Sequence, residues 1–272
     1  MTSSTHGDGG DRDIVKCLPA ECLAHIITFT SPSDACRSSM VSRSFQSIAD
    51  SDYVWKSFLP SDHEDILSGS ESWPELSAKE LYLHLCHNPV ILTNQTMSFA
   101  LERQSGKKCY MVGARGLEIV WGNTPAYWIW TCLPESRFGE VAELQYVWWF
   151  DIKGRIESRM LSPATNYAAY FVFQFSRERR GFSDRAIDLR VQLEKSGEEG
   201  AESKCVIIDP PDGVPKPYQE RGDGWLEIEI GEFFNDIGVD DTLLCSLMET
   251  DGSFFKAGLI VEGLEFRPKI TM

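Results

Sequence analysis

The sequence predicts an α+β protein of two parts, in which a small N-terminal helical region precedes an antiparallel β-sandwich of jelly-roll type. Two observations carry this prediction. Before Asn88-Pro89 the chain carries residues that typically begin and end helices. After this dipeptide it carries short runs of alternating apolar residues separated by Gly and Pro. Because a residue that precedes proline avoids the helical conformation, we place the boundary between the two parts at this dipeptide.

Composition and charge limit the classes of function. The chain has 272 residues, of which 42% are hydrophobic and 25% charged, so it is long enough to bury a sizeable core. A net charge of −15 disfavours nucleic acid and anionic membranes as partners, because phosphate binding needs clustered Lys and Arg. The opening "MTSSTHGDGGDRD" lacks the basic start and apolar middle of a signal peptide, and no apolar run is long enough to span a membrane. We therefore expect a cytoplasmic or nuclear protein.

Cysteine and histidine spacing predicts no metal and no other cofactor. The eight cysteines are scattered without a CxxC pair, so we interpret them as reduced and mostly buried small hydrophobic residues. The stretch "HLCH" places Cys86 between His84 and His87, but three neighbouring ligands do not close a tetrahedral site. An ordinary helix surface is the expectation for this stretch.

The N-terminal part divides into a tail and several helices. Residues 1–16 are polar, Gly-rich and acidic, which predicts a disordered tail. The capping box Ser77-Ala-Lys-Glu80 begins a helix that carries Leu81 and Leu85 and ends before Pro89. Proline, serine and aspartate at capping positions predict three earlier helices, over 19–29, 34–49 and 52–59.

The early helices carry apolar residues on more than one face. A unit of roughly 45 residues is marginally stable by itself, because little of its surface is buried on folding. Another surface must therefore cover part of these helices. Either the C-terminal part of the chain or a separate protein partner would do so.

Strict alternation predicts the strands of the C-terminal part. "IDLRVQLE", residues 187–194, puts four aliphatic residues on one face and four polar residues on the other. "GWLEIEI", residues 224–230, alternates in the same way, and "AAYFVFQF", residues 168–175, is apolar on both faces like a covered strand. Further strands are expected over 107–112, 117–121, 143–150, 156–161, 204–208, 243–248 and 257–266.

One stretch, "LEIVWGNTPAYWIW" at residues 117–130, concentrates aromatic side chains beside a turn. Trp121 and Trp128 border the loop that contains Gly122-Asn-Thr-Pro125. Flat aromatic faces at a loop can stack on the apolar face of a pyranose while nearby polar groups bind its hydroxyls. Tryptophan in a sandwich also fills cores, and of the adjacent Trp148 and Trp149 at least one should do so.

The N-terminal helical region resembles an F-box. The resemblance spans "CLPAECLAHIITFTSPSDACRSSMVSRSFQSIADSDYVWKSFLP", residues 17–60, with residues 61–89 as a helical connector. It implies docking on a Skp-type adaptor, which joins the protein to a cullin scaffold and a ubiquitin-conjugating enzyme. The residues expected to contact the adaptor are Leu18, Pro19, Ile26, Ile27, Val41 and Trp55.

Residues 90–272 resemble the Nictaba-like phloem-lectin domain, through "LEIVWGNTPAYWIW", "VAELQYVWWFDIKGRIES", "DGWLEIEIGEFFNDIG" and "KAGLIVEGLEFRPK". In sugar-binding members the two tryptophans of the W…YW motif contact oligosaccharide, which implies this role for Trp121 and Trp128. Where these members carry an acidic residue after the GEFFN strand, this chain aligns Thr242. The implied carbohydrate-binding residues are Trp121, Asn123, Tyr127, Trp128, Asp240 and Asp241.

Together the two resemblances imply a non-catalytic subunit of a ubiquitin ligase that binds glycans or glycoproteins. The alternative is an F-box adaptor whose sandwich recognises a polypeptide without sugar. An enzyme is not expected, because all five histidines fall at or before residue 87 and no pair of carboxylates stands out for glycoside hydrolysis.

Overall fold

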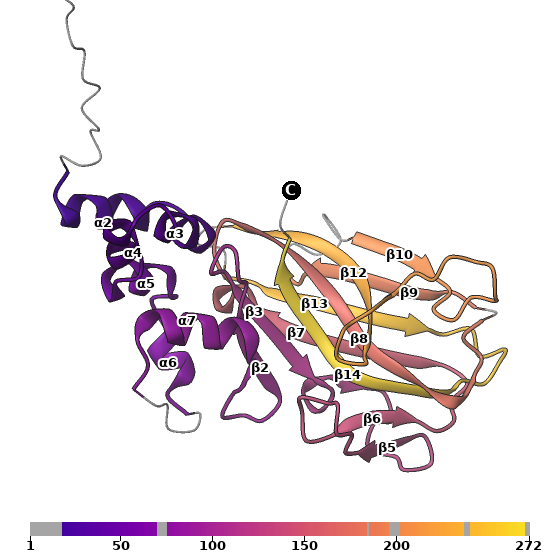
Figure 1. The fold of residues 1–272 in the computed structure, drawn as a ribbon. Coiled ribbons are helices and arrows are strands. Elements are labelled where there is room, and N and C mark those ends of the chain that lie inside the picture. The colour runs from indigo at the N-terminus through magenta and orange to yellow at the C-terminus, as the bar shows by residue number, and fades with distance from the viewer. Residues whose placement is uncertain (1–17, 70–74, 184, 196–201, 237–239, 270–272) are drawn as a thin grey trace, which may run out of the picture.

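The computed structural model describes residues 18–69, 75–183, 185–195, 202–236 and 240–269. Helices occupy the N-terminal part and antiparallel strands the C-terminal part, so the predicted fold class is confirmed (Figure 1). The predicted tail over residues 1–16 lies outside the described residues. None of the described helices combines the length and the apolar run that crossing a membrane needs.

Three of the described helices begin after a serine, Ser31, Ser42 or Ser77, whose hydroxyl accepts a hydrogen bond from a backbone N–H of the first turn. The capping box of Ser77 and Glu80 forms as predicted. The predicted helix over 34–49 is instead two helices, because the Ser42 hydroxyl accepts a hydrogen bond from the N–H of Phe45 and starts a new one. The helices are α2 (Ala20–Thr28), α3 (Pro32–Ser39), α4 (Arg43–Ala49), α5 (Asp52–Phe58), α6 (His63–Leu67) and α7 (Ala78–His87).

The strands form two antiparallel sheets. The larger has the order β1-β2-β3-β14-β8-β12-β11, with β6 pairing with both β14 and β5. The smaller has the order β10-β9-β13-β7-β4. The bounds are β1 (Val90–Ile91), β2 (Met97–Leu101), β3 (Lys108–Gly113), β4 (Glu118–Ile119), β5 (Trp128–Thr131), β6 (Val141–Leu144), β7 (Phe150–Glu157), β8 (Thr165–Arg180), β9 (Ile187–Leu193), β10 (Glu202–Val206), β11 (Gln219–Glu220), β12 (Leu226–Asn235), β13 (Thr242–Glu249) and β14 (Ala257–Pro268).

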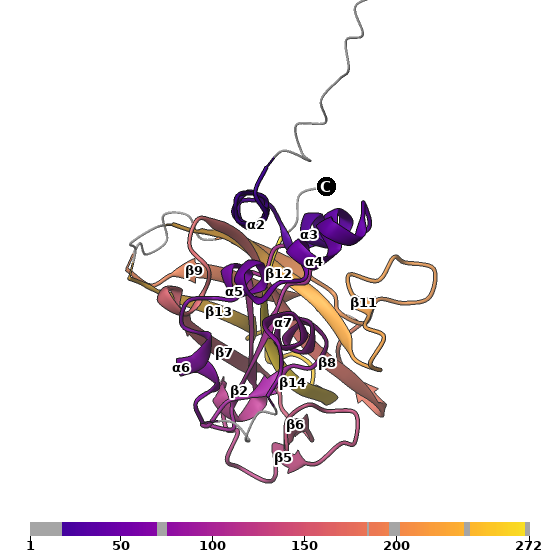
Figure 2. The same cartoon turned by 60° about the vertical axis from the view of Figure 1, so that its left-hand side comes forward.

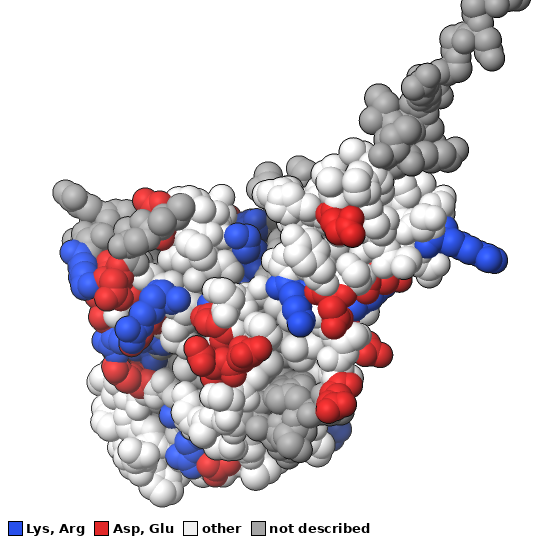
Figure 3. All heavy atoms as spheres, turned by 90° about the vertical axis from the view of Figure 1, so that its left-hand side faces the viewer, with Lys and Arg blue, Asp and Glu red and all other residues white. Residues whose placement is uncertain are grey.

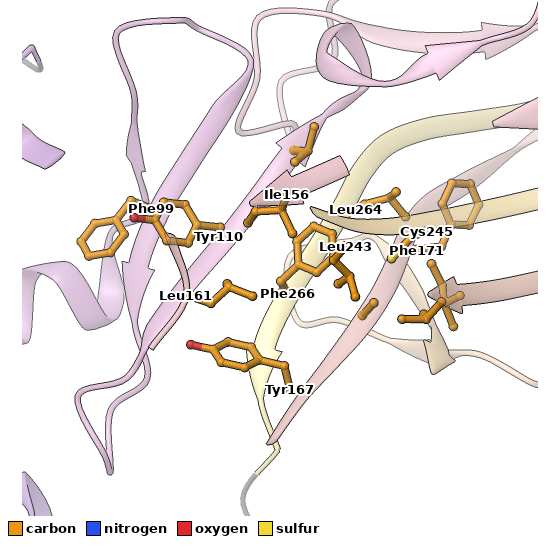
Figure 4. Close-up of a cluster of buried hydrophobic side chains, with 14 of the residues drawn as sticks. Phe99, Tyr110, Ile156, Leu161, Tyr167, Phe171, Leu243, Cys245, Leu264 and Phe266 are labelled. Carbon is orange, nitrogen blue, oxygen red and sulfur yellow. The ribbon is translucent and has the colours of Figure 1, made fainter. Parts of the chain in front are cut away.

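The core lies between the inner faces of the two sheets (Figure 4). Alternation puts Ile156 of β7 and Leu243 of β13 on one side of it, with Phe171 of β8 and Leu264 of β14 on the other. Gly154 lets the sheets approach closely, since a Cβ atom there would lie 2.4 Å from Leu264 Cδ1. Burial of these side chains is the main source of the sandwich's stability.

Two predicted strands were misplaced. The expected strand over 143–150 is divided between the end of β6 and the start of β7, with an irregular aromatic segment between them. The expected strand over 156–161 contains the end of β7 and a short 3-10 helix over Ser158–Met160. Apolar composition alone suggested strands there, but regular pairing stops at Leu144 and resumes at Phe150, with an isolated bridge at Val147 between them, and it stops again at Glu157.

The helices and the sandwich share one hydrophobic core. Tyr82 of α7 packs against Trp55 of α5, with ring centroids 5.2 Å apart, and its hydroxyl lies 3.1 Å from the carbonyl oxygen of Arg103 in the β2–β3 turn. Burial raises the pKa of this hydroxyl well above its ordinary value, so it remains a neutral donor. Gly106 in the same turn has a φ of 70°, and a Cβ atom there would lie 2.8 Å from the Phe58 carbonyl oxygen. Only glycine suits both the backbone conformation and the close contact.

The two ends of the sandwich differ. The helices contact one end, where Asp62 pairs with Lys108 at the start of β3 and α7 packs on β2 (Figures 1 and 2). At the opposite end lie the loops β4–β5, β6–β7 and β13–β14, because Glu249, the last residue of β13, pairs with Phe150, the first residue of β7. The sheets therefore separate the helical end from a loop end.

We predict that replacing Tyr82 destabilises both parts of the chain together. Tyr82→Ala removes a fully buried side chain and should lower the free energy of unfolding by about 3 kcal/mol. Tyr53→Ala, at an exposed position of α5, is the matched control and should change it by less than about 1 kcal/mol. Urea unfolding followed by circular dichroism and tryptophan fluorescence measures both. An unchanged sandwich transition in Tyr82→Ala would show that the sandwich has a separate core.

Candidate functional site

The loop between β4 and β5 is a sequence of tight turns that brings one tryptophan to the surface. The N–H of Gly122 donates to the carbonyl of Ile119 at 2.9 Å, and the N–H of Thr124 donates to the carbonyl of Trp121 at 2.8 Å. Trp130 Nε1 donates to the Gly122 carbonyl at 2.8 Å and so fixes the turn. Trp121 has a φ of 58°, in the left-handed region that costs an ordinary residue roughly 1 kcal/mol or more.

Trp121 is the exposed centre of a small aromatic group. Its side chain keeps 39% of its surface exposed, and its ring centroid lies 4.4 Å from that of Trp149 and 5.4 Å from that of Tyr127. Asn123, two residues along the same turn, is also exposed. We call Trp121, Tyr127 and Trp149 the Trp121 platform. It offers aromatic surface beside amide and hydroxyl groups that can bind sugar hydroxyls.

The structure does not place Trp128 on this platform. Trp128 starts β5, where it pairs with Leu144 of β6, and only 1% of it is exposed. Its indole Nε1 is buried without a hydrogen-bond partner. The next residue, Ile129, points outward, as alternation along a strand requires. Trp128 therefore packs in the core and presents no face to a ligand.

Asp240 and Asp241 lie far from the platform. Asp241 is buried, and its Oδ1 accepts hydrogen bonds from the N–H groups of Thr242 at 2.7 Å and Lys195 at 3.1 Å. The two aspartates precede β13, which pairs there with the end of β7, whereas the Trp121 turn lies beside Asp151 at the start of β7. At about 3.3 Å per residue these points are about 20 Å apart. The structure therefore does not bring the two aspartates to Trp121.

The residues expected to contact an adaptor also divide into two groups. Leu18, Pro19, Ile26 and Val41 are exposed. Ile27 is buried, and Trp55 is buried against Tyr82, with its Nε1 donating to the Ala49 carbonyl at 2.8 Å. Ile27 and Trp55 therefore hold the helices together and are not free to contact a partner.

The set of expected adaptor contacts leaves out three exposed apolar residues of the same helical region. Phe29 is 77% exposed and Met40 78% exposed, and Tyr53 is also exposed. The available signal was helical spacing, because Phe29 lies one turn from Ile26 and so shares its face. A pocket of about 470 Å³ lies between α2 and Tyr53. Figure 3 shows a largely uncharged area over these helices, with an acidic side chain within it.

The "HLCH" stretch forms the end of α7. His87 Nδ1 lies 2.7 Å from the Leu83 carbonyl oxygen, and Cys86 is half-buried. Burial raises the pKa of the Cys86 thiol to about 11, so the sulfur is protonated at neutral pH. Within the described ranges, no three His, Cys, Asp or Glu side chains are grouped so that they could hold a metal ion.

Comparison with known proteins shows two matching families. The phloem protein 2 family model matches residues 107–268, and the F-box-like model matches residues 15–61. The chain is 43% identical over 257 residues to F-box protein PP2-B10 of Arabidopsis thaliana, covering 92% of this chain and 93% of that one. It is 43% identical over 253 residues to putative F-box protein PP2-B12 of the same plant, covering 93% and 97%.

Among solved structures, a family 35 carbohydrate binding module from Clostridium thermocellum aligns with a TM-score of 0.29 at 11% identity. The alignment covers 58% of this chain and 96% of the module.

We predict that replacing the two tryptophans of the aromatic stretch changes stability to very different extents. Trp128→Ala should lower the free energy of unfolding by about 3–5 kcal/mol, because it empties a buried indole site. Trp121→Ala should change it by no more than about 1 kcal/mol, because that side chain is partly exposed and its backbone is already strained. Thermal and urea unfolding of both variants measure the difference. Equal losses would contradict the assignment of Trp128 to the core.

Proposed function

This chain belongs to the family of F-box proteins that carry a phloem protein 2 domain, and we propose that it is the substrate-recognition subunit of a Skp-cullin-F-box ubiquitin ligase. Its sandwich binds a glycan or glycoprotein, and the F-box helices bind the Skp-type adaptor that connects it to the cullin. In this assembly the chain catalyses no reaction. It holds the substrate for a ubiquitin-conjugating enzyme.

The exposed apolar face of the helices supports adaptor binding. Ile26, Phe29, Met40, Val41 and Tyr53 are all more than half exposed, although the sandwich covers other parts of the same helices. A cluster of exposed aliphatic and aromatic side chains is typical of the centre of a protein–protein interface. The adaptor would bury this cluster.

The single observation that carries the sugar-binding proposal is the conformation of Trp121. A large aromatic residue occupies a left-handed backbone position that glycine or asparagine would accept at less cost, and much of its ring is exposed. Such a residue adds little to the core, so its presence is better explained by a ligand than by folding. Tyr127 and Trp149 extend the aromatic surface, and Asn123 supplies hydrogen-bonding groups.

The arrangement of the two surfaces suits a receptor. The helices lie at one end of the sandwich, and the Trp121 turn belongs to the loops at the other end. A bound glycoprotein would therefore not compete with the adaptor for space.

For adaptor binding, we predict that a charge on the helical face disrupts the complex without unfolding the chain. Ile26→Asp places a carboxylate at an exposed position that the adaptor would cover, and it should weaken binding at least tenfold. Val214→Asp, at an equally exposed position in the sandwich, is the matched control and should bind normally. A pull-down with purified Skp-type adaptor, paired with thermal melts, gives the answer. If the adaptor retains Ile26→Asp as well as wild type, this face is not the adaptor-binding surface.

For glycan binding, we predict that Trp121→Gly abolishes binding while preserving or raising the melting temperature, since glycine accepts the left-handed conformation. Phe234→Ala removes an exposed aromatic side chain from the end of β12, at the helical end of the sheets, and should leave glycan binding unchanged. A glycan array with wild type and both variants measures this.

The outcome that contradicts sugar binding is equally specific. If wild type binds no glycan on the array, and captured partners are retained after enzymatic deglycosylation, the sandwich recognises polypeptide instead.

A further inference from the structure

A second group of aromatic residues lies at the same loop end of the sandwich. Tyr146 and Phe255 are stacked, with ring centroids 5.1 Å apart, and Trp148 lies 6.1 Å from Tyr146 and 6.4 Å from Phe255. Trp148 is 47% exposed, and Tyr146 is also exposed. We call these three residues the Trp148 platform. They come from the loops β6–β7 and β13–β14. The sequence analysis expected at least one of Trp148 and Trp149 in the core, but Trp148 is exposed and Trp149 is only half-buried.

The Trp148 platform is held rigidly by buried groups. The backbones of Val147 and Lys256 exchange two hydrogen bonds, at 3.0 and 2.7 Å, which join the two loops. The Lys256 ammonium is buried, forms an ion pair with buried Glu249, and donates a hydrogen bond to the Trp148 carbonyl at 2.7 Å. A buried ion pair is expensive to desolvate, so its use to fix an exposed tryptophan indicates a preorganised surface.

The two platforms are neighbours. Trp149 belongs to the Trp121 platform and Trp148 to the other, and consecutive Cα atoms are about 3.8 Å apart. The two platforms are therefore attached to one short backbone segment, and a ligand that contacts both must cross this segment, which calls for a glycan of several sugar residues.

The chemistry of the loop end favours a sugar over a protein. In the loops 120–127, 145–149 and 250–256, every exposed large hydrophobic residue is aromatic, namely Trp121, Tyr146, Trp148 and Phe254. The helical face, in contrast, exposes aliphatic Leu, Ile, Met and Val side chains together with Phe29 and Tyr53. Aromatic faces without aliphatic neighbours suit the C–H face of a pyranose better than an apolar protein surface.

Polar groups accompany these rings. Arg185 lies over the Phe254 ring, with its guanidinium carbon 5.4 Å from the centroid, and also pairs with Asp251 at 3.1 Å. The pKa of Asp251 is below its ordinary value, chiefly because the Ser253 hydroxyl donates to its carboxylate. The carboxylate and the guanidinium thus lie beside Phe254, the sequence neighbour of Phe255, and such charged groups can bind sugar hydroxyls.

We propose that Tyr146, Trp148 and Phe255 form a second stacking subsite, which binds a further residue of the same glycan that occupies the Trp121 platform. The preferred ligand is then an oligosaccharide that extends across both platforms. This inference rests on the proposed glycan binding.

The test is a calorimetric titration of the full chain with N-acetylglucosamine oligomers, from the monosaccharide to the hexasaccharide, and with galactose-containing oligomers of the same lengths. For wild type, Kd should fall as the oligomer becomes long enough to reach the second subsite. Trp148→Ala should remove this gain, raising Kd for long oligomers by roughly tenfold while leaving the shortest binding ligands unaffected. Phe234→Ala is the exposed-aromatic control and should titrate like wild type at every length.

Each other result has a distinct meaning. Trp121→Gly should weaken oligomers of all lengths, which separates the two subsites. If Trp148→Ala titrates like wild type throughout, the second subsite is excluded and the proposed function stands. The same conclusion follows if Trp148→Ala changes only the sedimentation of the protein, because the platform is then a contact between copies. If wild type binds no glycan at any length, both the subsite and the proposed function are overturned.

Discussion

The placement of the helices on the sandwich depends on the packing of Tyr82. Its ring fills the space between Trp55 and the β2–β3 turn, and its hydroxyl approaches the carbonyl oxygens of Glu102 and Arg103 in that turn. Asp62 and Lys108 add an ion pair at the edge of the same contact, but a partly exposed pair contributes little by comparison. The packing of the Tyr82 side chain, rather than the ion pair, therefore determines how the helices are placed on the sheets. It also sets the orientation of the exposed helical face relative to the loop end.

The exposed aromatic residues depend on a different set of buried contacts. Trp121 keeps its left-handed backbone only because hydrogen bonds from Gly122, Thr124 and Trp130 over-determine the turn. Trp148 is held through its carbonyl by Lys256, which has an ion-pair partner inside the protein. In both cases a backbone fixed by hydrogen bonds holds an exposed side chain that contributes little to the stability of the fold. This is the arrangement expected where binding must not be opposed by the entropy of ordering a loop.

Local patterns made much of the fold predictable. Alternation identified β9 and β12, and the spacing of Ser77 and Glu80 identified the start of α7, because these signals need only neighbours in sequence. The errors at the candidate sites arose where contacts are non-local. Trp128 is core because its partner Leu144 lies in another strand, and Asp241 lies far from Trp121 because β13 pairs antiparallel with β7. Trp55 is buried by Tyr82, which lies beyond the boundary of its own helical unit. No periodicity within one segment contains that information.

The close approach at Gly106 also limits how freely the two parts of this chain can be exchanged between proteins. The turn offers no room for a side chain against the Phe58 carbonyl, and its shape matches one particular tyrosine on the connector. An F-box joined to an unrelated recognition domain would lose the contact with Tyr82 and the Gly106 turn, and Trp55 would become exposed to solvent. Recombination that keeps the protein folded must therefore transfer the helices, the connector and the β2–β3 hairpin together. The two family models, in contrast, match residues 15–61 and 107–268 and leave the connector out.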